Sequence, residues 1–238
     1  MNSIENINGV KTPLAYQLTE YDCAQATFLN AMRFLLNRNE IPPVMIKYIT
    51  QYTLDTVGEH GQLGLCGTSE HAIEYLGRWI NKSNKLIGVD VETKLLRGKE
   101  ATTENKELYD CITSGGAAIL RVWSECEHYV LCTNAEEDYV YVFDPYFEVD
   151  TAYDDDATVT MISDMPFNYN RKVLKERLFE NTHNDYSLVK NEESCILLLY
   201  RKKKVQEPAE PTEPTIDYKL KYEELEKAYN DLNSDYKA

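Results

Sequence analysis

The stretch YQLTEYDCAQAT occupies residues 16–27 and predicts a polar turn that runs into an α-helix. The helix is expected to span about residues 22–37, with Asp22 as its N-cap. Cys23 then lies in its first turn, where the helix dipole favours a thiolate over a thiol. The thiolate is the form of cysteine that attacks acyl carbons. The stretch therefore predicts a helix that presents a nucleophilic cysteine.

Two strand-like runs contain the partners that such a cysteine needs. They read EHYVL at residues 127–131 and YVYVFDPY at residues 139–146, and the polar turn NAEED lies between them. If the runs are neighbouring antiparallel strands, His128 and Asp144 lie side by side at one edge of the sheet. A histidine that exchanges protons with the nucleophile, and an acid that orients the histidine, form a catalytic triad.

Gln17 lies six residues before Cys23, so its side-chain amide can join the Cys23 backbone N–H in holding an oxyanion. Each residue alone has a simpler interpretation. A single cysteine is usually a small core residue, and an Asp-Pro pair usually ends a strand. A lone histidine is usually a satisfied strand residue. The joint order of Gln17, Cys23, His128 and Asp144 favours the catalytic interpretation.

A metal site is the main competing interpretation, because Cys126, His128 and Cys132 have the same parity in a strand. At about 3.3 Å per residue, the two cysteines lie roughly 20 Å apart, too far for one ion to bridge. The chain has no CxxC and no HExxH motif. We therefore expect no metal and no other cofactor. The remaining cysteines are expected to be core thiols: Cys66, Cys111, Cys132 and Cys195.

Composition excludes several classes of partner. The 238 residues carry a formal charge of −15, which argues against a nucleic-acid partner, since phosphates require a basic surface. No apolar run reaches transmembrane length, and the chain does not open like a secretory signal, so no membrane partner is expected. Six cysteines without paired spacing indicate reduced thiols and a cytoplasmic location.

Predicted helices come mainly before predicted strands, which favours an α+β fold: a helical N-terminal half packed on an antiparallel sheet. Helices are expected at about residues 22–37, 42–55, 68 onward, 104–113 and 171–180, and a glycine-rich loop at 58–67. Strands are expected at about 86–95, 117–123, 127–133, 139–144, 158–162 and 195–201.

The C-terminal part differs from the predicted catalytic domain at residues 1–205. Residues 206–215 have proline at every third position and predict an extended acidic linker. Residues 216–238 predict an amphipathic or coiled-coil helix with the apolar seam Tyr218, Tyr222, Leu225, Tyr229, Leu232 and Tyr236. A helix this short is marginal alone, so it needs a partner: another chain, a neighbouring molecule or the catalytic domain itself.

With these motifs the chain resembles the C39-like group of papain-fold cysteine peptidases over about residues 12–150. The resemblance rests on Gln17 before Asp22-Cys23, Gly67-Thr68, Gly115-Gly116 before AAILRV, His128-Tyr129-Val130 and the VFDPY segment at 142–146. It implies a papain-like fold with the cysteine helix against the sheet. It also implies that Cys23 is the nucleophile, His128 the general base and acid, Asp144 the orienting residue and Gln17 the oxyanion donor. The chain departs from the family in having Ala24-Gln25-Ala26 after the cysteine.

The predicted function is that of a cysteine peptidase, which cuts a peptide or isopeptide bond of a peptide or protein substrate through an acyl-thioester. Two alternatives use the same residues. A papain-fold acyltransferase would pass the acyl group to an amine or thiol instead of water, and a catalytically silent peptide-binding module would have an unreactive Cys23. A triad alone does not separate hydrolase from transferase.

Overall fold

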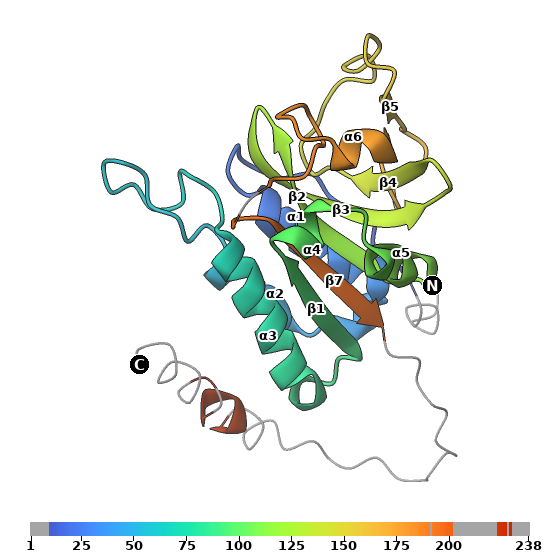
Figure 1. The fold of residues 1–238 in the computed structure, drawn as a ribbon. Coiled ribbons are helices and arrows are strands. Elements are labelled where there is room, and N and C mark those ends of the chain that lie inside the picture. The colour runs from blue at the N-terminus through green and yellow to red at the C-terminus, as the bar shows by residue number, and fades with distance from the viewer. Residues whose placement is uncertain (1–9, 191, 202–222, 228, 230–238) are drawn as a thin grey trace, which may run out of the picture.

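A computed structural model describes residues 10–190, 192–201, 223–227 and 229 of the chain (Figure 1). Its centre is an antiparallel sheet with the strand order β1-β7-β2-β3-β4-β6-β5. The strands are β1 (Val91–Arg97), β2 (Ala117–Ser124), β3 (Cys126–Ala135), β4 (Tyr139–Phe143), β5 (Val159–Met161), β6 (Arg171–Leu174) and β7 (Cys195–Arg201).

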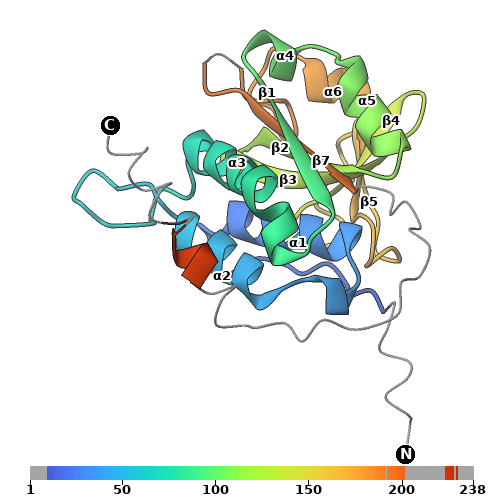
Figure 2. The same cartoon turned by 90° about the horizontal axis from the view of Figure 1, so that it is seen from below.

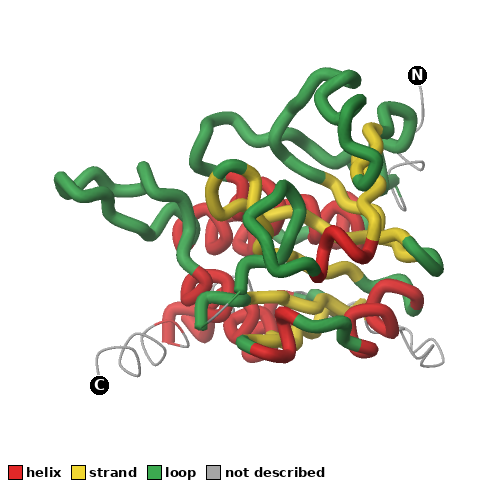
Figure 3. Tube along the Cα trace, turned by 45° about the horizontal axis from the view of Figure 1, so that its top comes forward, coloured by secondary structure: helices red, strands yellow, loops and turns green. Residues whose placement is uncertain are grey.

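Helices cover both faces of the sheet, so that the strands lie between two helical layers (Figures 2 and 3). One layer holds α1 (Cys23–Leu35), α2 (Pro43–Tyr52) and α3 (Glu70–Ile87). The other holds α4 (Lys99–Thr102), α5 (Lys106–Thr113) and α6 (Lys175–Phe179). The short 3₁₀ helix η2 (Arg38–Glu40) follows α1. This arrangement confirms the predicted α+β class, with the N-terminal helices packed on an antiparallel sheet.

Two apolar cores lie on the two faces of the sheet, because side chains alternate along each strand. In β7, Leu197 and Leu199 contribute to the core under α1, α2 and α3, whereas Ile196 and Leu198 contribute to the core under α4, α5 and α6. All four side chains are buried. A strand that is buried on both faces reads as a continuous apolar run, which explains the sequence CILLLY in β7.

Helix α1 is fixed to the centre of the sheet by apolar packing and by one buried hydrogen bond. Phe28, Ala31 and Met32 are completely buried in the first core. The Thr27 hydroxyl donates to the carbonyl of Tyr129 on β3 at 2.8 Å. Because Thr27 is one turn after Cys23 and Tyr129 follows His128, this bond sets the position of the cysteine helix relative to the histidine strand.

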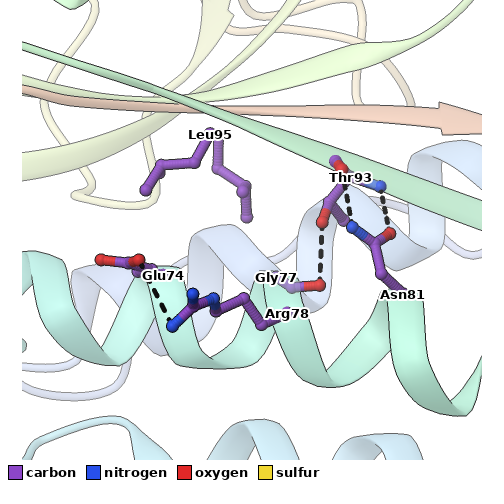
Figure 4. A pocket seen from close by; sticks show the side chains of 7 residues that line it. Glu74, Gly77, Arg78, Asn81, Thr93 and Leu95 are labelled. Carbon is purple, nitrogen blue, oxygen red and sulfur yellow. Dashed lines mark hydrogen bonds and ion pairs between the residues drawn. The ribbon is translucent and has the colours of Figure 1, made fainter.

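Helix α3 protects the edge strand β1. The carboxamide of Asn81 bonds both to the N–H and to the carbonyl of Thr93 at 2.8 Å, which satisfies backbone groups that an edge strand leaves open (Figure 4). Gly77 permits this close approach, since a Cβ there would lie 2.8 Å from the Leu197 side chain. A small pocket of about 100 Å³ remains beside these residues, and its polar groups bond to one another.

Several predicted boundaries were wrong. The predicted helix at 171–180 is instead strand β6 followed by the short helix α6. Arg171 and Val173 are buried, whereas Lys172 and Leu174 are only half-buried, which is the alternation of a strand. Strand β6 pairs with both β4 and β5. The strand predicted at 86–95 begins only at Val91, because α3 continues to Ile87 and ends at Gly88, which adopts a left-handed conformation.

The loop predicted at 58–67 projects from the molecule between α2 and α3 (Figure 1). Its base is closed by a β-bridge between Val57 and Leu63 and by the hydrogen bond from Gly64 N to Thr56 O, 2.8 Å. Cys66 lies in this loop and is exposed, so the prediction that it is a core thiol was wrong. The cysteines at 111, 132 and 195 are buried, as predicted.

The predicted C-terminal helix is described only at residues 223–227 and 229, which are helical. The seam residues Leu225 and Tyr229 are half-buried, and the Tyr229 ring packs edge-on against Tyr48 of α2 at 6.4 Å. This contact is made within the same chain; the partner of the seam as a whole stays a prediction. The linker at 206–215 and the seam positions 218, 222, 232 and 236 lie outside the described residues.

Candidate active site

The three predicted triad residues meet where the inner strand β3 begins and the neighbouring strand β4 ends. His128 lies two residues after the start of β3, and Asp144 directly follows β4. The imidazole Nε2 of His128 lies 2.7 Å from Oδ1 of Asp144, and His128 also interacts with the Cys23 thiol at the start of α1. Their exposed fractions are only 7% for Cys23, 6% for His128 and 3% for Asp144, so bulk water is largely excluded. The structure thus places the imidazole between the thiol and the carboxylate.

The electrostatics of the histidine–aspartate pair favour the charged forms. Burial by itself would lower the pKa of His128, but the charge and hydrogen bond of Asp144, with a smaller influence of Cys23, raise it well above its ordinary value. Burial would raise the pKa of Asp144, but His128, Arg171 and the N–H of Tyr146 lower it.

Asp144 is held from its other side by Tyr186 and Arg171. The Tyr186 hydroxyl donates to Oδ2 of Asp144 at 2.8 Å, and Nε of Arg171 donates to the same hydroxyl at 3.1 Å. Both Tyr186 and Arg171 are 1% exposed. Arg171 also donates to the carbonyls of Asn170 (3.0 Å) and Tyr146 (3.4 Å). A buried hydrogen-bonded series therefore runs from His128 through Asp144 and Tyr186 to Arg171.

The backbone of Asp144 is fixed as tightly as its side chain. The Asn170 carboxamide accepts from Asp144 N at 2.7 Å and donates to Asp144 O at 2.8 Å. The N–H of Tyr146 donates to Oδ1 at 2.8 Å, so the Asp144 side chain closes the turn that follows β4. Residues 186–189 run beside β2, where Tyr186 N donates to Trp123 O at 2.8 Å, and this pairing brings the Tyr186 ring to the site. The carboxylate is thus positioned by three separate segments.

Gln17 lies beside the Asp144 turn, because its backbone N–H donates to the carbonyl of Pro145 at 2.8 Å. Its side-chain nitrogen donates to Thr19 O at 2.7 Å, and its buried Oε1 has no partner among the described residues. An amide nitrogen carries two hydrogens, so one remains after the Thr19 bond.

Asp22 occupies the N-cap position as predicted, but its carboxylate makes no capping bond to the helix. It accepts instead from the N–H groups of Leu18 (3.0 Å) and Thr19 (2.7 Å) and from the Thr19 hydroxyl (2.5 Å). Burial would raise the pKa of Asp22, but these hydrogen bonds lower it. Asp22 therefore shapes the turn that carries Gln17, which corrects its predicted role as a helix cap.

Cys126 is an exposed thiol close to the site, since its electrostatic partners include His128 and Cys23. Burial of its thiol group raises the pKa of Cys126, with Cys23 and nearby glutamates adding to this and His128 opposing it. Among the described residues, no group of His, Cys, Asp and Glu side chains is arranged to hold a metal ion. No helix in the described part of the chain combines the length and apolar character needed to cross a bilayer.

Sequence reasoning missed the residues that support the pair: Thr27, Asn170, Arg171 and Tyr186. Thr27 and Asn170 bond to backbone groups far away in the sequence, which no local pattern indicates. Arg171 lies in the sequence Arg-Lys-Val-Leu, which has no polar–apolar alternation, and a helix was predicted there instead. Tyr186 lies in an irregular segment with φ of 66°, where periodicity gives no information.

Comparison with known proteins identifies related structures at low similarity. No protein-family model matches the chain, and no curated protein matches it. Its structural neighbours include a Bacillus anthracis protein assigned to the C39-like peptidases, at 18% identity and a TM-score of 0.47, covering 84% of this chain and 98% of that one. A second is the peptidase domain of Streptococcus mutans ComA, at 12% identity and a TM-score of 0.36, covering 79% of this chain and 98% of that one.

A third neighbour is a double-glycine-motif protease from an AMS/PCAT transporter, solved with its leader peptide, at 14% identity and a TM-score of 0.36. The match covers 81% of this chain and 94% of that one. The neighbours are thus C39-like peptidases and peptidase domains. Similarity at this level does not assign an activity to the chain.

Proposed function

We propose that this chain is a cysteine peptidase in which Cys23 is the nucleophile, His128 the general base and acid, and Asp144 the residue that orients the imidazole. The observation that carries the proposal is the buried His128 ring, hydrogen-bonded to the Asp144 carboxylate and close enough to the Cys23 thiol to interact with it. Two partners of these types, at a helix N-terminus, match a nucleophile–base–orienter set.

The proposed reaction begins with proton transfer from the Cys23 thiol to His128. The thiolate attacks the carbonyl carbon of the substrate, and the C=O electron pair moves onto oxygen to give a tetrahedral oxyanion. The Cys23 backbone N–H and the remaining Gln17 amide hydrogen are the proposed donors to that oxyanion. His128 then gives its proton to the leaving amine, and an acyl-thioester remains on Cys23. A water molecule, deprotonated by His128, hydrolyses the thioester and regenerates the thiol.

The proposal is tested by measuring the rate at which iodoacetamide alkylates Cys23 in the protein and in His128→Gln. Cys66 and Cys126 are exposed and would also react, so both are replaced by serine in every sample. Cys111, Cys132 and Cys195 are buried. Labelling is located by peptide mass spectrometry. At pH 6, where an unassisted thiol is less than about 1% ionised, we expect His128→Gln to slow Cys23 labelling by about tenfold or more.

Glu137→Gln serves as a matched control, because Glu137 is an exposed residue of the β3–β4 turn, at the end of β3 far from His128. Its labelling rate should equal that of the parent. The effect of His128→Gln should also decrease at alkaline pH, where any accessible thiol ionises without help. Equal rates at pH 6 with and without His128 would contradict an activated cysteine and leave a peptide-binding module. Cleavage of a peptide pool, lost in Cys23→Ser, then tests hydrolysis itself.

A further inference from the structure

Large apolar side chains are exposed on two segments that adjoin the catalytic residues. Leu18 is 91% exposed and Tyr21 39%, on the segment that leads into Cys23. Phe147 is 65% exposed and Val149 60%, on the segment that follows Asp144. Monomeric proteins rarely expose several large apolar residues together unless the surface binds something. The two segments directly precede Cys23 and follow Asp144 in the chain.

The two segments are packed against each other. The Tyr16 ring packs edge-on against Phe147, with centroids 5.2 Å apart, and also contacts the buried Phe143 at 5.5 Å. The backbone bond from Gln17 N to Pro145 O joins the same segments at 2.8 Å. The two segments that carry the exposed apolar side chains are therefore joined to each other next to Cys23 and Asp144 in the chain.

Carboxylates accompany these apolar groups. Glu20, Glu148 and Glu125 lie near enough to the Tyr146 hydroxyl to act on it electrostatically, Glu20 most strongly. The segments at residues 16–22, 124–127 and 146–157 contain no lysine and no arginine. These segments are therefore both apolar and negatively charged, without an opposing cation of their own.

We propose that this surface, formed by Leu18, Tyr21, Phe147 and Val149 with Glu20 and Glu148, binds a substrate segment that carries lysine or arginine beside bulky apolar side chains. The apolar groups would cover the bulky side chains, and the carboxylates would attract the cation and disfavour acidic segments. The inference rests on the proposed peptidase function only in identifying the bound segment as substrate.

The test measures fluorescence anisotropy of three labelled decapeptides with the full chain carrying Cys23→Ser, so that no turnover occurs. The first peptide contains leucine, phenylalanine and lysine. The second has glutamate in place of lysine, and the third has serine in place of leucine and phenylalanine. We expect the first to bind at least tenfold more tightly than either of the others, and its affinity to fall when salt rises from 0.05 to 0.5 M.

Two variants assign that binding to the surface. Exposed ion pairs contribute little individually, so the double variant Glu20→Gln/Glu148→Gln should weaken the first peptide by about tenfold, roughly threefold for each carboxylate. Leu18→Ser should also weaken it, with little risk to folding at a side chain so exposed. Glu137→Gln removes one negative charge beyond the other end of β3, and should leave affinity unchanged.

Equal binding of the lysine and glutamate peptides would overturn the proposal, as would an equal loss in Glu137→Gln. These outcomes are distinct from failure of the proposed function. If alkylation of Cys23 depends on His128 but the peptides are not discriminated, only the substrate preference fails. If alkylation is independent of His128 while the first peptide still binds through Glu20 and Glu148, the peptidase proposal fails and the binding surface stands.

Discussion

Removal of one hydroxyl group, in Tyr186→Phe, should destabilise the chain far more than the same change usually does. The Tyr186 hydroxyl donates to the Asp144 carboxylate at 2.8 Å and accepts from Nε of Arg171 at 3.1 Å. All three residues are nearly inaccessible to solvent. Phenylalanine keeps the ring packing and deletes only the group that connects the two charges.

The magnitude follows from these two bonds. A hydrogen bond to a charged group contributes about 1.5–3 kcal/mol, and a buried charged donor left without its acceptor costs at least as much. Arg171 keeps its bonds to the carbonyls of Asn170 and Tyr146, which limits the loss. We expect Tyr186→Phe to lower the free energy of unfolding by about 3 kcal/mol at neutral pH. For a domain of this size, that corresponds to a decrease in melting temperature of roughly 6–12 °C.

Urea unfolding followed by circular dichroism measures this effect, and Tyr129→Phe is the matched control. Tyr129 is also a buried tyrosine, and it directly follows His128, but its hydroxyl has no hydrogen-bond partner among the described residues. Its removal should change the free energy of unfolding by less than about 0.5 kcal/mol or increase it, because an unsatisfied buried group is eliminated.

A double-mutant cycle separates the hydroxyl bridge from general packing. In the Arg171→Met background, the cost of Tyr186→Phe should fall by more than about 1 kcal/mol, since one of its two partners is gone. Tyr186→Phe should also slow alkylation of Cys23 at pH 6 by several-fold, because Asp144 would hold the imidazole less firmly. The reasoning is refuted if Tyr186→Phe costs no more than Tyr129→Phe, or if its cost is the same in both backgrounds.

Two further predictions concern the His128–Asp144 pair and the cysteine helix α1. His128→Gln should reduce the free energy of unfolding most between about pH 5 and 6.5. The stabilisation from the raised pKa of His128 is complete below its unfolded pKa of about 6.5 and disappears as pH rises through the folded pKa. The stabilisation from the lowered pKa of Asp144 disappears in acid. A difference from the parent that grows with alkaline pH, measured by urea unfolding, would contradict this sign. Thr27→Val should cost about 1 kcal/mol and slow Cys23 labelling, because it deletes the buried bond between α1 and β3; Thr113→Val, which deletes an exposed helix bond of 2.7 Å, should do neither.

The fold could be predicted wherever local pattern and tertiary role agree. The cysteine helix, the strands at 117–124, 126–135 and 139–143, and the final strand at 195–201 all carry continuous apolar runs or clear helical spacing. Prediction failed at residues 171–174, where the charged pair Arg171-Lys172 hid a strand with two buried positions. Burial of an arginine depends on partners distant in the chain, and local propensity does not contain that information.

Some residues of the candidate site could likewise be predicted from local sequence, and others could not. His128 and Asp144 could be predicted because adjacent antiparallel strands bring the start of one beside the end of the next, and Cys23 because its turn and helix are local. Asp22 was placed correctly at a helix start, yet its hydrogen bonds serve the preceding turn. Tyr186 could not be predicted, because its place depends on pairing between residues 186–189 and β2.

Arg171 gives the buried site a balanced charge in the state that the proposed reaction requires. When the proton has moved from Cys23 to His128, the site contains a thiolate, an imidazolium and the Asp144 carboxylate, which together carry one net negative charge. Burial penalises an uncompensated charge by several kcal/mol. Arg171, linked to Asp144 through Tyr186, supplies the missing positive charge without contacting the thiol. The ion pair of the proposed reaction would then form within a neutral buried group of four residues that includes an arginine far from Cys23 in sequence.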